Sequence, residues 1–276
     1  MNKNQVMNTL KKYISFFFII SFILLSCSTV PLTDRKQLNL IPTSTMLSMS
    51  FQQYDEFLKT NKLSKNQDQT QMVKRVGTRI QKAVEQYFTG KNMSHELRNY
   101  NWEFNLIESK EMNAWCMPGG KVAVYTGILP ITKDEAGLAV VIGHEIAHAI
   151  SKHGNERMSH GLITQMGGLA ISKALKNKPE QTRNLWMTVF GIGTQVGAIL
   201  PYSRLHENEA DHLGLIFISM AGYNPNTAVE FWERMTKKKG GKAPPEFLST
   251  HPSDETRIRK IKALLPEAMQ YYKRSN

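Results

Sequence analysis

One apolar segment, Ala136–Ile150, constrains the fold of this chain more than any other stretch. Its hydrophobic residues fall on every side of a helix, which is typical of a helix that is buried all round. Three strongly polar side chains interrupt it, at His144, Glu145 and His148. Because a buried polar side chain needs a partner, the segment predicts a site around these three residues.

The three residues form the pattern H-E-x-x-H. Residues four apart lie on one face of a helix, so the imidazoles of His144 and His148 can bind one zinc ion. Glu145 is then placed to act as the general base toward a water molecule. A catalytic zinc has three protein ligands and one open position, so we expect a third ligand downstream on another element.

The best candidate for the third ligand is Glu207. Asp211 lies one helical turn further on, where it can accept a hydrogen bond from a ligand histidine and fix its tautomer. Glu209 points to another side of the same helix, and we expect a structural role for it. His206 and His212 remain alternative ligands in this stretch.

Before the H-E-x-x-H helix, residues 102–107 alternate as a half-buried strand does, and residues 114–117 are a short apolar run. After the turn Pro118–Gly120, residues 121–126 are a further strand, and together these segments predict a small sheet. Thr132 and Glu135 form a capping box that predicts where the metal-motif helix begins. The fold class is therefore α+β: a mostly helical domain, residues 44–276, with a small β-sheet next to this helix. Helical spacing predicts further helices near 46–60, 69–89, 156–175, 181–199, 202–220, 225–238 and 253–264, and a final one after Pro266.

The N-terminus has the parts of a secretory signal. Its first residues carry lysines and no acid, and the apolar run Tyr13–Leu25 is shorter than the roughly 20 residues that span a membrane. The end of the run, Leu24–Cys27, resembles a bacterial lipobox. This predicts a signal peptide at residues 1–26, lipidation of Cys27 and a tether at 27–43. The alternative is an uncleaved N-terminal anchor.

The net charge and the cysteines lead to expectations about binding partners and about the state of the thiols. The net charge of +12 permits attraction to anionic membrane surfaces. Lys237–Lys239 is short and lacks interleaved aromatic residues, so we read it as a solvated face and expect no nucleic-acid partner. If Cys27 is acylated, Cys116 has no partner within the chain, and we expect it to be a buried free thiol.

Several motifs in a fixed order resemble one family. H-E-x-x-H is followed by Ser203-Arg204-x-x-Glu207-x-Glu209-Ala210-Asp211, as in the HtpX-type zinc metallopeptidases. These include the CAAX prenyl proteases, the mitochondrial Oma proteases and the bacterial envelope proteins BepA, LoiP and YcaL. Further matches are Gly119–Gly127, Ala221–Pro225 and Ser249–Ser253. The chain is most similar to the compact envelope lipoproteins.

The resemblance implies a zincin fold of the gluzincin type and a single Zn²⁺ per chain. His144, His148 and Glu207 would bind this ion, Asp211 would support a ligand, and Glu145 would be the general base.

The resemblance also implies two roles around the metal. His251 would lie near the ion, either to stabilise the transition state or to occupy the open position as a latch. The strand Lys121–Thr126 would be the edge strand that holds an extended substrate. Its substrate-binding residues would be Gly120, Val122, Val124 and Tyr125.

The expected function is that of a zinc-dependent endopeptidase of the bacterial cell envelope. It would be anchored through lipidated Cys27, face the periplasm and hydrolyse unfolded or misassembled proteins. Ser28 after the cysteine is compatible with the outer membrane. The alternative is an assembly factor or chaperone for outer-membrane proteins, working with envelope assembly machinery, in which the peptidase is minor or latched by His251.

Overall fold

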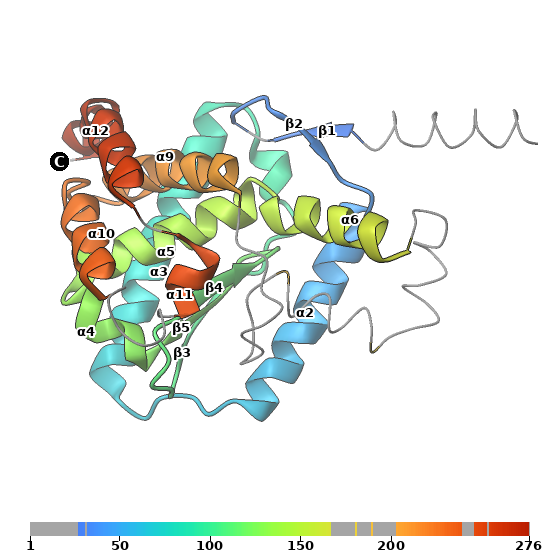
Figure 1. Cartoon of the computed structure of the whole chain (residues 1–276), viewed down its shortest axis with the longest axis horizontal. Helices are drawn as coiled ribbons and strands as arrows, with labels where there is room; N and C mark the ends of the chain where they lie inside the picture. Colours follow the sequence, from blue (N-terminus) through green and yellow to red (C-terminus); the bar gives the residue numbers. More distant parts are fainter. Residues whose placement is uncertain are drawn as a thin grey trace, which may run out of the picture.

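The computed structural model describes residues 27–30, 32–166, 180, 189, 203–238, 246–252 and 254–275. The predicted signal peptide and, apart from residue 189, the predicted helix at 181–199 lie outside these residues. None of the described helices has the length and apolar character needed to cross a bilayer. The elements, drawn in Figure 1, are in chain order β1 (Cys27–Thr29), β2 (Lys36–Leu38), α2 (Thr43–Thr60), α3 (Gln67–Gly90), η1 (Ser94–Leu97), β3 (Glu103–Ile107), β4 (Ala114–Met117), β5 (Lys121–Tyr125), η2 (Thr126–Ile128), α4 (Leu129–Thr132), α5 (Glu135–Ile150), α6 (His153–Met166), α9 (Arg204–Met220), α10 (Thr227–Lys238), α11 (Glu246–Thr250) and α12 (Glu255–Ser275).

The central sheet has the strand order β3-β5-β4, with β3 parallel and β4 antiparallel to β5. The expectation that Lys121–Thr126 is an edge strand is therefore wrong, because both edges of β5 are paired. The substrate-binding role expected for Gly120, Val122, Val124 and Tyr125 loses its structural basis. Gly119 and Gly120 both have a φ of +85°, which glycine adopts readily, and they form the turn that folds β4 back onto β5.

Helices cover both faces of this sheet, as alternating side chains along each strand require. Phe104, Cys116 and Val122 point into the main core with α3 and α5. Trp115 and Tyr125 point to the opposite face, where α2 packs against them. Figure 1 shows α2 and α5 on either side of the strands. The metal-motif helix is thus buried between the sheet and the C-terminal helices.

Helix α5 begins two residues later than the capping box predicts. The cap is Asp134, whose side chain accepts a hydrogen bond from the backbone N–H of Gly137 at 2.9 Å. Thr132 instead ends α4, and its hydroxyl donates to the carbonyl of Leu129 at 3.0 Å. The preceding short helix occupies Thr132, so the cap shifts to the next residue that can accept.

The two C-terminal helices predicted on either side of Pro266 form one helix, α12. Proline removes one backbone hydrogen bond from a helix. Ile261 before it and Ala268 after it are both buried in the main core, which holds the two halves in one line. Figure 1 shows α12 packed along α9, and α9 beside α5.

The segment predicted as a tether, 27–43, is part of the domain. Its strands β1 and β2 pair as an antiparallel hairpin. The backbone N–H of Leu40 donates to the Ser159 hydroxyl at 2.9 Å, and the side-chain amide of Asn155 donates to the carbonyl of Ile41 at 3.3 Å. The segment is therefore bound along α6 rather than extended into solvent.

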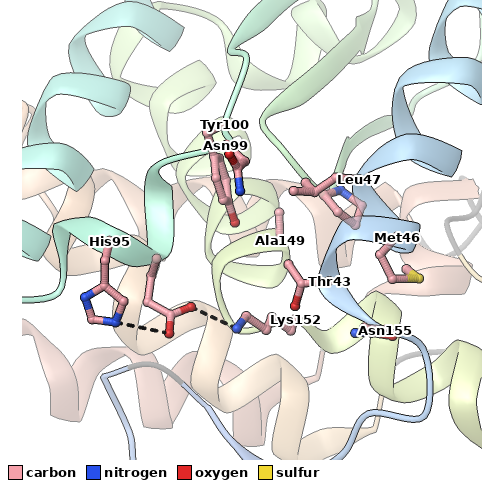
Figure 2. A pocket seen from close by; sticks show the side chains of 11 residues that line it. Thr43, Met46, Leu47, His95, Asn99, Tyr100, Ala149, Lys152 and Asn155 are labelled. Atoms are coloured by element: carbon pink, nitrogen blue, oxygen red, sulfur yellow. Dashed lines mark hydrogen bonds and ion pairs between the residues drawn. The ribbon is translucent and has the colours of Figure 1, made fainter.

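A surface cavity of about 150 Å³ lies where the start of α2, η1 and the end of α5 meet. Figure 2 shows its side chains, including the ion pair between Lys152 and Glu96 at 2.9 Å. Lys152 has a φ of +57° and forms the turn between α5 and α6. None of the residues predicted to bind metal or substrate lines this cavity.

Candidate metal centre

Four side chains from three parts of the chain converge on one point. His144 and His148 come from α5, Glu207 from α9, and His251 from the end of α11. All four are buried, and their candidate ligand atoms lie within 4.8 Å of one another. The Nε2 atoms of His144 and His148 are 3.0 Å apart, and Glu207 Oε1 is 3.3 Å from Nε2 of His148. The predicted ligand set is thus assembled by the fold.

The arrangement fits a bound cation. The other ring nitrogen of His144, Nδ1, lies 3.0 Å from Asp211, and Nδ1 of His148 lies 2.8 Å from His153. With protons at these Nδ1 atoms, both Nε2 lone pairs point at each other and at the Glu207 carboxylate. Three electron-pair donors this close repel unless positive charge lies between them, and a metal ion supplies that charge.

Asp211 supports His144 as predicted, and Arg257 supports Asp211. The guanidinium of Arg257 donates to both carboxylate oxygens of Asp211 at 2.8 Å and lies 2.7 Å from Glu207. It also stacks on the Trp232 ring at 3.5 Å. Arg257 follows the Ser249–Ser253 motif by four residues, and no role was predicted for it from the sequence.

The electrostatics of the site favour positive charge at His144. Burial alone would lower its pKa, but hydrogen bonds to Asp211 and Glu207 raise it to about 9. Burial also opposes ionisation of Glu207, yet the charges of His251 and Arg257 hold the pKa of this carboxyl well below its ordinary value. Glu207 is therefore ionised and ready to bind a cation.

Glu145 is placed as a general base requires. It is 3% exposed, and its Oε1 atom accepts no hydrogen bond from the described residues. Nε2 of His251 lies 3.4 Å from this oxygen. Burial raises the pKa of Glu145, although the charges of His251 and His144 lower it in part. The carboxylate is therefore more basic than an exposed glutamate.

His251 joins the group directly. Its Nδ1 atom is 3.1 Å from Nε2 of His144 and 3.0 Å from Oε1 of Glu207. Nδ1 of His251 therefore lies among the candidate ligand atoms of the group. Its role, either to stabilise the transition state or to occupy the open position, stays a prediction.

The alternative ligands do not belong to the group. His206 pairs with Glu156 at 2.9 Å and stacks on His153, and His212 pairs with Glu267 at 2.9 Å near the surface. Glu209 points away from the four-residue group, as expected, but it contacts His153 at 2.9 Å. His153 was not foreseen, although a further histidine soon after H-E-x-x-H would have been a signal.

Comparisons with known proteins find several metalloendopeptidases. The mitochondrial metalloendopeptidase OMA1 of Schizosaccharomyces pombe is 39% identical over 174 residues, which are 62% of this chain and 49% of that protein. OMA1 of Saccharomyces cerevisiae is 33% identical over 187 residues, 65% of this chain and 52% of that protein. The beta-barrel assembly-enhancing protease of Escherichia coli K12 is 29% identical over 162 residues, 57% and 33% of the two chains. The matched region spans about half the length of the two OMA1 relatives.

These relatives correct the predicted location. The OMA1 proteins match at higher identity and over more of this chain than the bacterial protease does, and those of both yeasts are named mitochondrial. The expectation of a lipoprotein that faces the periplasm from a bacterial outer membrane is therefore wrong. The side chain of Cys27 lies outside the described part of the structure, so its lipidation stays a prediction. Cys116 is a buried free cysteine, as predicted.

The family model for Peptidase family M48 matches residues 74–265, which include every candidate ligand, the base and Arg257. The match confirms the resemblance to HtpX-type metallopeptidases and the α+β fold class with its H-E-x-x-H helix. The prediction of a metallopeptidase is confirmed at this level. This chain belongs to peptidase family M48.

Proposed function

We propose that this chain is a zinc-dependent endopeptidase that cuts unfolded or misassembled polypeptides. The observation that supports this most is the convergence of the His144 and His148 Nε2 atoms on Glu207. Oε1 of Glu145, which accepts no hydrogen bond from the described residues, lies beside them. Two imidazoles and one carboxylate form a typical ligand set of catalytic zinc. Larger or harder cations such as Mg²⁺ prefer oxygen ligands alone.

The proposed mechanism of peptide-bond hydrolysis uses Glu145 as the general base. A zinc ion, when bound, polarises the scissile carbonyl and lowers the pKa of water. Glu145 Oε1 takes a proton from the attacking water and returns it to the leaving amine nitrogen. Burial raises the pKa of this carboxylate, which suits a group that must both accept and release a proton near neutral pH.

The substrate would lie along β4 rather than β5. No described strand pairs with the outer edge of β4. Tyr125 donates its backbone N–H to the Asn113 carbonyl, so the alternation of an antiparallel ladder turns the backbone groups of Cys116 toward that outer edge. Burial, and to a lesser extent the charge of Glu145, raises the pKa of the Cys116 thiol, which reflects how near β4 lies to the base. An extended peptide could pair with this edge and pass the metal.

The test is cleavage of an unfolded protein such as casein, with zinc content measured on the same samples. The parent protein should hold about one zinc per chain and lose cleavage with a chelator. Glu145→Gln should keep the zinc and lose cleavage by a factor of about 10² or more, because a general base is removed while the ligands remain. Cleavage by Glu145→Gln at the parent rate would refute the proposed mechanism.

A second candidate is an assembly factor or chaperone whose peptidase is held inactive. It is supported by the position of His251 Nδ1, 3.0 Å from Glu207 and 3.1 Å from His144, from which this nitrogen would occupy the fourth position. The name of the E. coli relative, a beta-barrel assembly-enhancing protease, joins both activities in one protein. His251→Ala distinguishes the two roles: faster casein cleavage indicates a latch, whereas slower cleavage with zinc retained indicates a catalytic role.

A further inference from the structure

A row of buried polar side chains runs from the metal centre to the N-terminal hairpin. It starts at Nδ1 of His148, which lies 2.8 Å from Nδ1 of His153. Nε2 of His153 lies 2.9 Å from Oε2 of Glu209. Glu209 in turn accepts hydrogen bonds from the Thr33 hydroxyl and, at 3.0 Å, from Nε of Arg35.

The protons in this row can be assigned from one end. A histidine that binds a metal through Nε2 carries its proton at Nδ1. His148 therefore donates from Nδ1 to Nδ1 of His153, which must accept there and carry its own proton at Nε2. His153 then donates from Nε2 to Glu209. Each contact then has one donor and one acceptor, and Glu209 accepts from His153 on one side and from Arg35 on the other.

Arg35 is the last residue of the row, at the end away from the metal centre. Besides Glu209, its two terminal nitrogens donate to the two carboxylate oxygens of Glu156 at 3.1 and 2.8 Å. Its side chain is only 17% exposed. Glu156 is held from the other side by His206 at 2.9 Å. An arginine that pairs with two buried acids, one of them through both terminal nitrogens, fixes their positions closely.

Each of the two candidate ligand histidines of α5 is thus connected to an arginine through other side chains. His144 reaches Arg257 through Asp211 alone, whereas His148 reaches Arg35 through His153 and Glu209. The second route leaves the region that matches the family, because that match begins at residue 74. His153 and Glu209 lie within the matched region, whereas Arg35 at the end of the row lies outside it.

We propose that Arg35, presented by the β1–β2 hairpin, is a positioning residue of the metal centre. It holds Glu209, Glu209 holds His153, and His153 keeps the His148 ring turned with Nε2 toward Glu207. The inference rests on the proposed metal site and goes beyond it, because it assigns part of the site to the N-terminal segment. Partners of this kind typically contribute about 10- to 100-fold to metal affinity.

The test compares zinc affinity among variants by competition with a chromophoric chelator. Arg35→Met removes the far end of the row, and Glu209→Gln removes the charge that His153 donates to. Each should weaken zinc binding by about 10- to 100-fold. The double variant should be little weaker than either single one, because both changes break the same row. Lys36→Met is the matched control, since Lys36 is an exposed cation on the same hairpin whose ammonium group donates to the Thr29 hydroxyl and whose carbonyl, which accepts from Arg35, is kept in the variant; its zinc affinity should equal that of the parent.

A second readout separates positioning from general loss of structure. Cobalt in place of zinc reports ligand geometry through its visible absorption, so Arg35→Met and Glu209→Gln should change the band positions while Lys36→Met does not. Arg35→Lys keeps the charge but loses the paired donors. The zinc affinity and the cobalt band positions of this variant should therefore lie between those of the parent and those of Arg35→Met. If Arg35→Met does not fold, Arg35→Lys and Glu209→Gln carry the test.

Two outcomes would overturn the inference. One is parent zinc affinity and an unchanged cobalt spectrum in folded Arg35→Lys and Glu209→Gln. The other is a loss of affinity in Lys36→Met equal to that in Arg35→Met. A parent protein that binds no zinc would overturn the proposed function as well, so the two failures are distinguishable.

Discussion

Gly214 of α9 lies against the backbone of His144 in α5. A Cβ atom at Gly214 would stand 3.2 Å from both the Cα and the backbone nitrogen of His144. Gly143 faces the same crossing, where a Cβ would lie 3.3 Å from the carbonyl oxygen of Gly214. The two helices can therefore approach closely at this point. Their approach brings Glu207 and Asp211 of α9 to the histidines of α5.

Gly214→Ala should push α9 away from His144 and weaken zinc binding by about tenfold, a loss comparable with that of a missing ligand support. Overpacking costs about 1–3 kcal/mol, and the better helix propensity of alanine returns up to about 1 kcal/mol, so stability should fall by up to about 2–3 kcal/mol. Gly90→Ala is the control, because nothing lies within 4 Å of a Cβ there. Equal zinc affinity in the two variants would contradict the role of this crossing.

Arg257→Met should lower both stability and zinc affinity. It leaves the buried acids Asp211 and Glu207 without their cation, and breaking a buried ion pair costs about 3–5 kcal/mol. Arg257→Lys should recover part of the stability but less of the affinity, since lysine cannot donate to both oxygens of Asp211 in one plane. Denaturant unfolding with and without zinc measures the two effects. A fully active Arg257→Lys would contradict the need for paired donors.

The ion pair between Arg35 of the β1–β2 hairpin and Glu156 of α6 should contribute less to stability in acid. Burial alone would raise the pKa of Glu156, but hydrogen bonds from His206 and Arg35 lower it from 4.5 to about 2. The unfolded chain then takes up the proton first, so the contribution of Glu156 is complete above pH 4.5 and disappears as the pH falls toward 2.

Denaturant unfolding of the zinc-free protein from pH 7 to pH 3 measures this loss. Glu156→Gln should be less stable than the parent by about 1–2 kcal/mol at pH 7, a figure reduced for partial solvent screening, and the gap should narrow toward pH 3. Glu85→Gln, at an exposed site on α3, should leave the pH profile unchanged. A constant gap between parent and Glu156→Gln would contradict the assignment.

Gly120→Ala should reduce stability rather than substrate binding. Gly120 has a φ of +85°, and a Cβ there would lie 2.4 Å from the Trp102 ring. Strain and overpacking together cost about 1–3 kcal/mol. A lowered melting temperature with an unchanged KM for a model peptide is expected. A raised KM at parent stability would restore the substrate role predicted for this glycine.

Peptides that pair with β4 should depend on their backbone amides. A substrate in which alternate amides are N-methylated loses the donors that an added strand offers to a sheet edge. We expect slower cleavage when the methylated amides face β4, and little change when the other set is methylated. Equal rates for both sets would show that the substrate is not held as a strand.

Much of the site was predictable because helical geometry is local. Residues four apart on a helix share a face, so His144 with His148, and Glu207 with Asp211, could be paired from spacing alone. The cap of α5 and the single helix α12 were not predictable in this way. Thr132 is occupied by a neighbouring short helix, and Pro266 is held in line by packing on both sides.

The order of the strands in the sheet could not be predicted from local spacing either. Alternation, short apolar runs and turn residues indicated the three segments of the central sheet, but these signals do not say which strand lies in the middle. The structure places β5 between the other two, so the free edge belongs to β4.

The sequence by itself determined the ligand types, their helices and the family, since these follow from residue identity and short-range spacing. Only the tertiary structure decided that His251 lies with the three predicted ligands, that Arg257 donates to Asp211, and that Arg35 connects to His148 through Glu209 and His153. These contacts join residues far apart in the chain. Their distances depend on how the helices and the hairpin pack, and no periodicity in the sequence records that.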